Sequence, residues 1–365
     1  MKKTLFLLSI AIFACKKEKT KEVVNTVPAF HLEKTAEDWG KTTPQFTLIA
    51  GPAQDVLEPR DLDFHPNRPN ELWILNRGDE NFGGNSVIIT NAGQSGQSAE
   101  QRRDGNAWHF MAHPSAMSFS KDNGNWGTGA EIQDANRQGG SFTGPSLWSS
   151  DLNVYAVPSG GNGSHLDMLH GSPYSMGIEW HSGNAFWVYD AFYKCLCFYD
   201  FAADHGPGAA DHSDGRIHRY FGMELTRQVN VPSHMVLDAA KKWLYIADPA
   251  NGRILRMDVT TGSKQADLNL INEPLAEHWR MQNEVWETFT SINLKRPSGI
   301  EIVGDILYVS DNETGEIIAY NINSRAELAR INTGKPGIMG IKANTDGKLW
   351  FVNATSNEVF RIDPK

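Results

Sequence analysis

The sequence predicts an all-β fold, a six-bladed β-propeller, and a repeated motif is the first of three observations behind that prediction. In each copy a proline is followed by apolar residues three and five positions later, the alternation expected of a strand with one buried face. The six copies are "EPRDLDF" from Glu58, "HPSAMSF" from His113, "SPYSMGI" from Ser172, "VPSHMVL" from Val231, "RPSGIEI" from Arg296 and "KPGIMGI" from Lys335.

The segments after most copies are the second observation, because they read as a strand, a turn and another strand. The clearest is "KKWLYIADPANGRILRMDV" from Lys241, in which residues 248–252 carry the Asp, Pro, Asn and Gly of a tight turn. Its counterparts begin at Asn184, Asp305 and Gly347. Four-stranded units spaced by roughly 40 to 60 residues are typical of propeller blades.

The third observation is a spare strand, "QFTLIAG" from Gln45, which precedes the first copy. We expect it to join the last blade and close the ring, which removes open sheet edges. Two stretches fit less well. Residues 124–163 are rich in Gly, Ser and Asn, so the strands around Trp126 and Trp148 are weakly marked. The segment "EPLAEHWRMQNEVWETF" from Glu273 has a rough helical spacing of apolar residues and predicts a short helical insertion, over one face or packed on blade 4.

The first residues, "MKKTLFLLSIAIFAC", combine two lysines with an apolar run too short to span a bilayer. They predict an export signal over 1–15, a tether over 16–44 and the propeller over 45–365. Ala14-Cys15 resembles the lipobox of bacterial lipoproteins, which implies lipidation of Cys15, a membrane anchor and a place in the cell envelope. Lys16 resembles the residue found in lipoproteins of the outer membrane, facing the periplasm or the surface. An ordinary signal peptide with an incidental cysteine is the alternative.

Charge and cysteine content narrow the possibilities for the domain. The net charge is −9 and no cluster of Lys and Arg follows the tether, so we expect no nucleic-acid partner. Cys195 and Cys197 stand two apart and point to the same face of a strand, where a disulfide would be strained. They are therefore predicted to be buried free thiols, and the domain to be held by its core.

The stretch "NRGDENFGGNS" from Asn76 falls in the turn between the second and third strands of the first blade. In a propeller such turns open on the same face as the turns that begin each blade. This face is predicted to bind a ligand through Arg77, Asp79 and Asn81 and through residues of the equivalent turns, Asp190, Asp248 and Asp311.

Histidines concentrate in the middle blades, and four of them are candidate ligands for one divalent metal, zinc or else copper or calcium. They are His113, His165, His170 and His234. The alternative is that these imidazoles cap loops and donate to carbonyl groups. His205 and His212 lie between third and fourth strands, and we expect them on the opposite face.

The proline-led blades with Asp-rich turns resemble NHL-type β-propellers over residues 45–365. Arg77-Gly78-Asp79, followed by residues 84–86, resembles one loop of the peptidyl-α-hydroxyglycine amidating lyases. The resemblance implies that Arg77 orients an anionic substrate group and that Tyr193, one place from the lyases' tyrosine, handles protons. The lyases carry histidines directly after the leading prolines, where this chain has Arg60, Ser115, Tyr174, Ser233, Ser298 and Gly337. A metal would therefore be held in a rearranged way.

Two functions follow from these observations. The first is a lipid-anchored propeller that binds a peptide, a glycan or a small anion at the rim of its central channel. The second is a metal-dependent lyase or hydrolase similar to the amidating lyases. The calcium-dependent six-bladed lactonases are a third class, for which Glu58, Asp61 and Asn230 offer only part of a ligand set.

Overall fold

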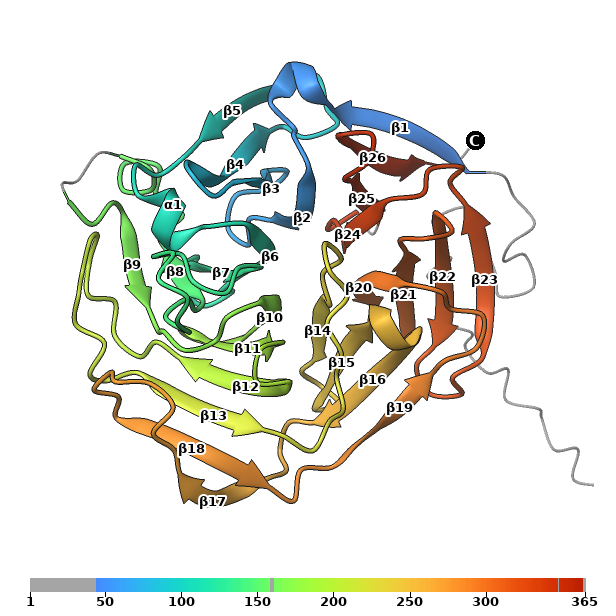
Figure 1. The fold of residues 1–365 in the computed structure, drawn as a ribbon. Coiled ribbons are helices and arrows are strands. Elements are labelled where there is room, and N and C mark those ends of the chain that lie inside the picture. Colours follow the sequence, from blue (N-terminus) through green and yellow to red (C-terminus); the bar gives the residue numbers. More distant parts are fainter. Residues whose placement is uncertain (1–43, 158–160, 347, 364–365) are drawn as a thin grey trace, which may run out of the picture.

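The computed structural model describes residues 44–157, 161–346 and 348–363, and it confirms the six-bladed propeller (Figure 1). Six sheets surround a central channel, and the proline-led segment forms the innermost strand of each. Blade 1 comprises β2 (Pro59–Phe64), β3 (Leu72–Asp79), β4 (Gly83–Thr90) and β5 (Ser98–Arg102). Blade 2 comprises β6 (Pro114–Phe119), β7 (Trp126–Ala130), β8 (Ser146–Trp148) and β9 (His165–Met168). Blade 3 comprises β10 (Ser175–Ser182), β11 (Ala185–Asp190), β12 (Cys195–Asp200) and β13 (Arg216–Tyr220). Blade 4 comprises β14 (Met235–Asp238), β15 (Trp243–Asp248), β16 (Arg253–Asp258) and β19 (Trp286–Thr290). Blade 5 comprises β20 (Pro297–Val303), β21 (Ile306–Asp311), β22 (Glu316–Asn321) and β23 (Glu327–Asn332). Blade 6 comprises β24 (Ile338–Ala343), β25 (Leu349–Asn353), β26 (Glu358–Asp363) and β1 (Gln45–Ala50).

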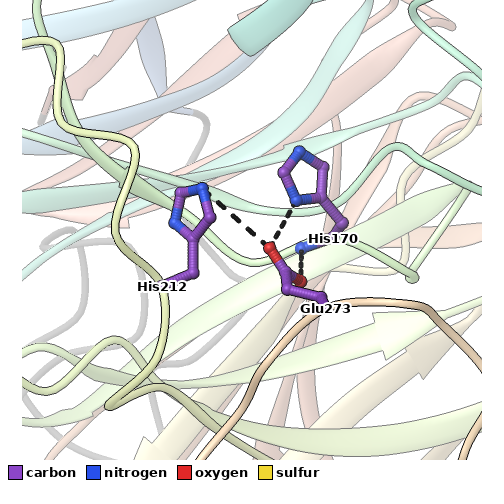
Figure 2. Close-up of side chains that lie close together, drawn as sticks. All are labelled: His170, His212 and Glu273. Atoms are coloured by element: carbon purple, nitrogen blue, oxygen red, sulfur yellow. Dashed lines mark hydrogen bonds and ion pairs between the residues drawn. The ribbon is translucent and has the colours of Figure 1, made fainter.

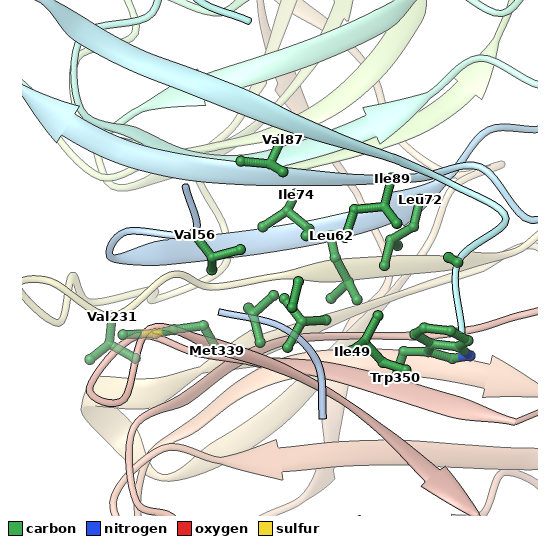
Figure 3. Packing of buried hydrophobic residues seen from close by; sticks show 14 residues of the cluster. Ile49, Val56, Leu62, Leu72, Ile74, Val87, Ile89, Val231, Met339 and Trp350 are labelled. Atoms are coloured by element: carbon green, nitrogen blue, oxygen red, sulfur yellow. The ribbon is translucent and has the colours of Figure 1, made fainter. Parts of the chain in front are cut away.

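Strand β1 closes the ring as the sequence predicts. It pairs antiparallel with β26, with Phe46 opposite Ile362. Figure 3 shows the apolar core that this closure creates between blade 1 and blade 6. Leu62 and Ile74 face Met339 and Trp350 there, and all four are buried. Burying this apolar surface stabilises the closed ring, because the first and last blades share one core.

The predicted helical insertion is wrong, because the segment from Glu273 forms strands of two different blades. β18 (Glu277–Gln282) pairs with β17 (Ser263–Asp267), and this hairpin extends blade 3 by running parallel to β13. β19 then returns to blade 4 beside β16. The indole of Trp279 stacks on the imidazole of His218 with ring centroids 4.5 Å apart, a contact across strands that helical spacing does not provide. Elsewhere the described residues include the four-residue helix α1 (Ala107–Phe110) and two short 3₁₀ turns, η2 (Pro52–Gln54) and η3 (Pro249–Asn251).

The two cysteines are buried free thiols, as predicted. Their Sγ atoms lie 3.6 Å apart in β12, on one face of the strand. The fully buried guanidinium of Arg219 lies beside them and donates through Nη1 to the carboxylate of Asp190 at 2.6 Å. Paired in this way, the buried charge is compensated.

The predictions for the N-terminal segment fall largely outside the described residues. These include the signal over 1–15, the lipidation of Cys15 and all of the tether except Pro44. Within the part of the chain that the structure describes, no helix has the length and apolar content needed to cross a bilayer.

Candidate functional site

Arg77 lies near the end of β3, in the turn that the sequence pointed to. Its Nη2 is 3.2 Å from Nδ1 of His113, the residue just before β6. An arginine only donates, so His113 Nδ1 accepts this hydrogen bond. Burial, followed by the charge of Arg77, lowers the pKa of His113, which favours the neutral imidazole that this contact needs. His113 has φ +45°, and Glu58, at the equivalent place before β2, has the same value, so this backbone conformation belongs to the repeat.

A second arginine stands close by. Arg60, in β2, is only 5% exposed. Burial, and next the positive charge of Arg77, lower the pKa of Arg60 to about 10. Its ion pair is a long one, 3.7 Å from Nη2 to the exposed carboxylate of Glu58. Two guanidinium groups thus lie within electrostatic reach of each other without a close carboxylate between them.

Glu131 and Arg227 complete this group of charges. Glu131 directly follows β7 and is buried, and its Oε1 accepts from Arg227 Nη2 at 3.1 Å and from the amide of Asn230 at 2.7 Å. The Arg227 guanidinium also lies 3.7 Å from the centre of the Tyr174 ring. We call the group formed by Arg60, Arg77, His113, Glu131 and Arg227 the rim cluster. Its residues come from blades 1 and 2 and from the segment before blade 4.

The rim cluster contains hydrogen-bond donors without partners. The Nε atoms of Arg60, Arg77 and Arg227 are each buried and unpaired, and Glu131 Oε2 is unpaired as well. Buried polar groups are normally hydrogen-bonded, so three orphaned donors at one place call for an explanation. The cluster combines three guanidinium groups with one buried carboxylate, and this excess of positive charge suits an anion.

Sequence reasoning identified Arg77 and His113 but missed the other members of the rim cluster. Arg60 could have been found, because it is the one charged residue that directly follows a leading proline. Glu131 and Arg227 lie in irregular segments, and nothing in their local sequence marks them.

The predicted ligand-binding residues of the turns make local contacts. Asp79 and Asn81 are exposed, and Asp79 caps its own turn by accepting from the amide of Asn81 at 2.7 Å. The other three carboxylates are fully buried and stabilise their own turns. Asp190 pairs with Arg219 and Asp248 pairs with Arg253. Asp311 accepts hydrogen bonds from four backbone amides. Their role in ligand binding stays a prediction, and these contacts do not add to it.

Tyr193, the predicted proton-transfer residue, lies in the turn after β11. Its ring packs against the Arg219 guanidinium, 5.0 Å from ring centre to the guanidinium carbon. Arg219 belongs to the buried group around Asp190 and is separate from the rim cluster. The catalytic role of Tyr193 therefore stays a prediction, without a contact to Arg77 to support it.

The four histidines predicted to share one metal occupy four different environments. His113 contacts Arg77, while His165 stacks on Phe110 with ring centroids 3.6 Å apart. His234 is buried, with Nε2 3.3 Å from the carbonyl oxygen of Ser115, and burial lowers its pKa to about 3. The imidazole of His170 bonds to Glu273 through Nδ1 at 2.6 Å. Among the described residues these four histidines thus form no common centre.

The expected position of His212 is also wrong. The loop between β12 and β13 carries it next to His170, with ring centroids 5.4 Å apart, and not to the opposite face. Figure 2 shows His170, His212 and Glu273 turned toward one another. Local sequence could not reveal this group, because its members come from three loops that meet only in the folded ring.

A cavity of about 520 Å³ lies at the other end of the channel, where the inner strands finish. Each of the six inner strands contributes to its wall, and the polar lining includes Asp63, Ser118, Glu179, Glu301 and Lys342. Lys342 Nζ is 3.5 Å from Glu301 Oε2. Burial raises the pKa of Glu301 to about 7, while Lys342 opposes that rise. None of the predicted site residues lines this cavity.

The carboxylates near this cavity also connect neighbouring blades. Asp61 and Asp63 of blade 1 accept from the amides of Met117 and Phe119 in blade 2, at 2.9 and 3.1 Å. Glu179 of blade 3 accepts from an amide of blade 4 at 3.1 Å. Inner strands have an unpaired edge toward the channel, and these side chains satisfy its N–H groups.

The comparisons with known proteins support the fold. No protein-family model matches the chain, and no curated protein matches it in sequence. Among solved structures, a luciferin-regenerating enzyme is similar at 11% identity and a TM-score of 0.53, over 88% of this chain and 95% of that one. The β-propeller domain of Cps50 (Swd1) from Myceliophteria thermophila is similar at 8% identity and a TM-score of 0.51, over 88% and 100% of the two chains. The WD40 β-propeller domain of Doa1 is similar at 9% identity and a TM-score of 0.50, over 88% of this chain and 96% of that one. At these identities the likeness shows the propeller fold alone.

Proposed function

We propose that this protein binds a small anion, a carboxylate or a phosphate, at the rim cluster. The observation that carries the proposal is the set of three buried arginine Nε atoms without hydrogen-bond partners. A carboxylate or phosphate oxygen would accept from such donors and would offset the repulsion between Arg60 and Arg77 that lowers the Arg60 pKa.

The surroundings of the rim cluster suit this role. The planar guanidinium fork matches a carboxylate in a bidentate geometry, and Arg77 keeps a partly exposed face from which a ligand can approach. Arg227 is held by Glu131 and by the Tyr174 ring, so its orientation is fixed before a ligand arrives. Preorganised donors bind more tightly because little entropy is lost on binding.

Titration calorimetry with succinate and with inorganic phosphate tests the proposal. We expect the unaltered protein to bind at least one of the two, and Arg77→Ala to weaken that binding by roughly 10- to 100-fold, the effect of losing one charged hydrogen bond. Arg103→Ala is the matched control, because Arg103 is an exposed arginine nearby that packs on Phe82. Circular dichroism and the melting temperature should be unchanged in both variants. Equal affinities in the two variants, or no binding by the unaltered protein, would exclude the proposed site.

A metal-dependent lyase or hydrolase similar to the amidating lyases is the second candidate. The contact between Arg77 and the imidazole of His113 favours it, since an anion-binding group then stands beside a potential base. The expected reaction is the release of glyoxylate from a peptidyl-α-hydroxyglycine in the presence of zinc. Release that is unchanged by Arg77→Ala and His113→Gln would contradict this assignment.

Export and lipid anchoring belong to the same proposal and rest on residues 1–15 of the sequence. They can be tested by producing the full-length chain in bacteria supplied with a labelled fatty acid. The unaltered chain should carry the label and partition with membranes, whereas Cys15→Ser should remain unlabelled. Equal labelling of both chains would place the lipid elsewhere, and no labelling of either would exclude the anchor.

A further inference from the structure

Three loops that are far apart in sequence meet beside the outer strands of blades 2 and 3. Figure 2 shows the three side chains that these loops bring together. His170 follows β9, His212 lies between β12 and β13, and Glu273 lies between β17 and β18. Their nearest nitrogen and carboxylate oxygen atoms all lie within 4.8 Å of one another. We propose that these three residues bind a divalent transition metal ion, with zinc as the best fit.

The distances are close to those that a zinc ion needs. In a tetrahedral site with bonds of about 2.1 Å, neighbouring ligand atoms lie about 3.4 Å apart. Glu273 Oε1 is 2.6 Å from His170 Nδ1 and 3.9 Å from His212 Nε2, so these two separations bracket that value. Small shifts of the side chains would bring all three atoms onto one ion. Two histidines and a glutamate are also an established zinc ligand set, which leaves a fourth position open for water or a ligand.

The hydrogen bonds around His212 leave its other nitrogen free for a metal. His212 Nδ1 lies 2.6 Å from Asp167 Oδ1, and a carboxylate only accepts, so Nδ1 carries the proton. In the neutral ring Nε2 then has a lone pair, which faces Glu273 Oε1, a second acceptor. A cation between these two atoms turns that contact into an attraction. Metal-bound histidines commonly have such a carboxylate behind them, which fixes the tautomer and orients the ring.

The group is largely enclosed by the protein. His170 is 8% exposed, and Asp167, which bonds to His212, is fully buried. Glu273 is oriented from both oxygens, because its Oε2 accepts from the amide of His170 at 3.1 Å. The three side chains are thus held in place by neighbouring groups, and they are not a chance meeting of exposed side chains.

The fold brings these loops together through close backbone contacts. Gly171 has φ +84°, and a Cβ at this position would collide with Ile271, which lies between β17 and β18. The β17–β18 hairpin therefore packs directly on the backbone beside His170. On the other side, the amide of Ala276, just before β18, donates to the carbonyl oxygen of Gly215 at 2.9 Å. This bond joins the β17–β18 hairpin to the loop that carries His212. A bound ion would fasten the β17–β18 hairpin to the ring. This inference does not depend on anion binding at the rim cluster.

Metal analysis of the full-length protein, purified without a histidine tag, tests the site. After treatment with a chelator and addition of zinc, we expect one ion per chain. Glu273→Gln and His212→Asn should each lower zinc affinity by at least about 100-fold, a loss at or beyond the upper end of what outer-shell changes cause. Glu273→Gln is nearly isosteric and guards against misfolding, which circular dichroism would report. His181→Asn is the control, since His181 is a half-buried histidine that bonds to Trp187 away from the site.

Cobalt provides a second readout that does not depend on affinity alone. The cobalt-loaded protein should show the strong visible absorption of a four-coordinate ion, and both variants should lose it while His181→Asn keeps it. A wild-type protein that holds well under one zinc ion per chain would overturn the proposal. Variants that bind zinc as tightly as the control would overturn it as well.

Discussion

The two ends of the central channel use charged residues in opposite ways. Where the inner strands begin, the rim cluster combines three arginines with one buried glutamate, and the arginines keep unpaired Nε donors. Where the inner strands finish, three carboxylates from blades 1 and 3 accept backbone hydrogen bonds from the next blade, and Lys342 faces them all. The carboxylates at the second end accept hydrogen bonds from the backbone of the next blade, whereas the arginines at the first end keep N–H donors that have no partner.

The binding site that we propose therefore lies away from the cavity at the other end of the channel. The cavity of about 520 Å³ lies at the end where the charges already have partners. Each unpaired donor in the rim cluster has lost its hydrogen bonds to water and gained none in return, which costs free energy unless a ligand completes them. The following changes would break or sharpen this contrast.

The largest effect is expected from Lys342→Met. This change removes the ammonium group that faces Asp61, Asp63, Glu179 and Glu301 and takes away the nearest counter-charge of those carboxylates. Breaking a buried ion pair from one side costs about 3–5 kcal/mol, so urea denaturation should show a loss of that order. Lys335→Met is the control, because Lys335 forms a half-exposed pair with Glu358 and should change stability by less than about 1 kcal/mol. Equal losses in the two variants would mean that the channel charges do not connect the blades.

A pH-dependent effect is expected from Glu301→Gln. The folded protein holds the Glu301 proton up to a pKa of about 7, whereas an unfolded chain releases it near the ordinary value of 4.5. Between these values the folded state binds more protons, so this group makes stability fall as pH rises, and the loss is complete above about pH 7. The stability of Glu301→Gln relative to wild type should therefore increase between pH 5 and pH 8, by on the order of 1–3 kcal/mol. Urea denaturation at both pH values measures it, and a constant difference would contradict the raised pKa.

The smallest effect is expected from Glu131→Gln in the rim cluster. Glutamine can still accept the hydrogen bonds of Arg227 and Asn230, but the one buried negative charge among the arginines is lost. The Glu131 carboxylate would then no longer repel the anion or compete with it for the arginines. The affinity for the anion should rise on the order of 10-fold, which is about 1.4 kcal/mol. Calorimetry with succinate or phosphate measures this change. Glu179→Gln, at the other end of the channel, should leave the affinity unaltered, and a weaker affinity in Glu131→Gln would contradict the rim cluster as the binding site.

Much of the fold could be predicted because its signals are local. A leading proline and two apolar residues mark each inner strand, and the chemistry of Asp248 to Gly252 marks a turn, so six blades and the closing strand β1 follow from short segments. The buried free cysteines also follow from local geometry. The segment from Glu273 misled the prediction because Trp279 and Trp286 belong to strands of different blades, whose partners lie about 60 and 30 residues away (279 against 218, 286 against 257).

The sequence by itself determined the number of blades, the strand available to close the ring and the turn that holds Arg77, because each is marked by residues within a few positions of one another. Only the tertiary structure decided that Arg60 and Arg227 gather around Glu131, and that His212 and Glu273 meet His170. Those groups form across blades, where the spacing along the chain says nothing about distance. The physical reason is that a propeller brings its loops together through ring closure and blade packing, which are long-range properties of the whole chain.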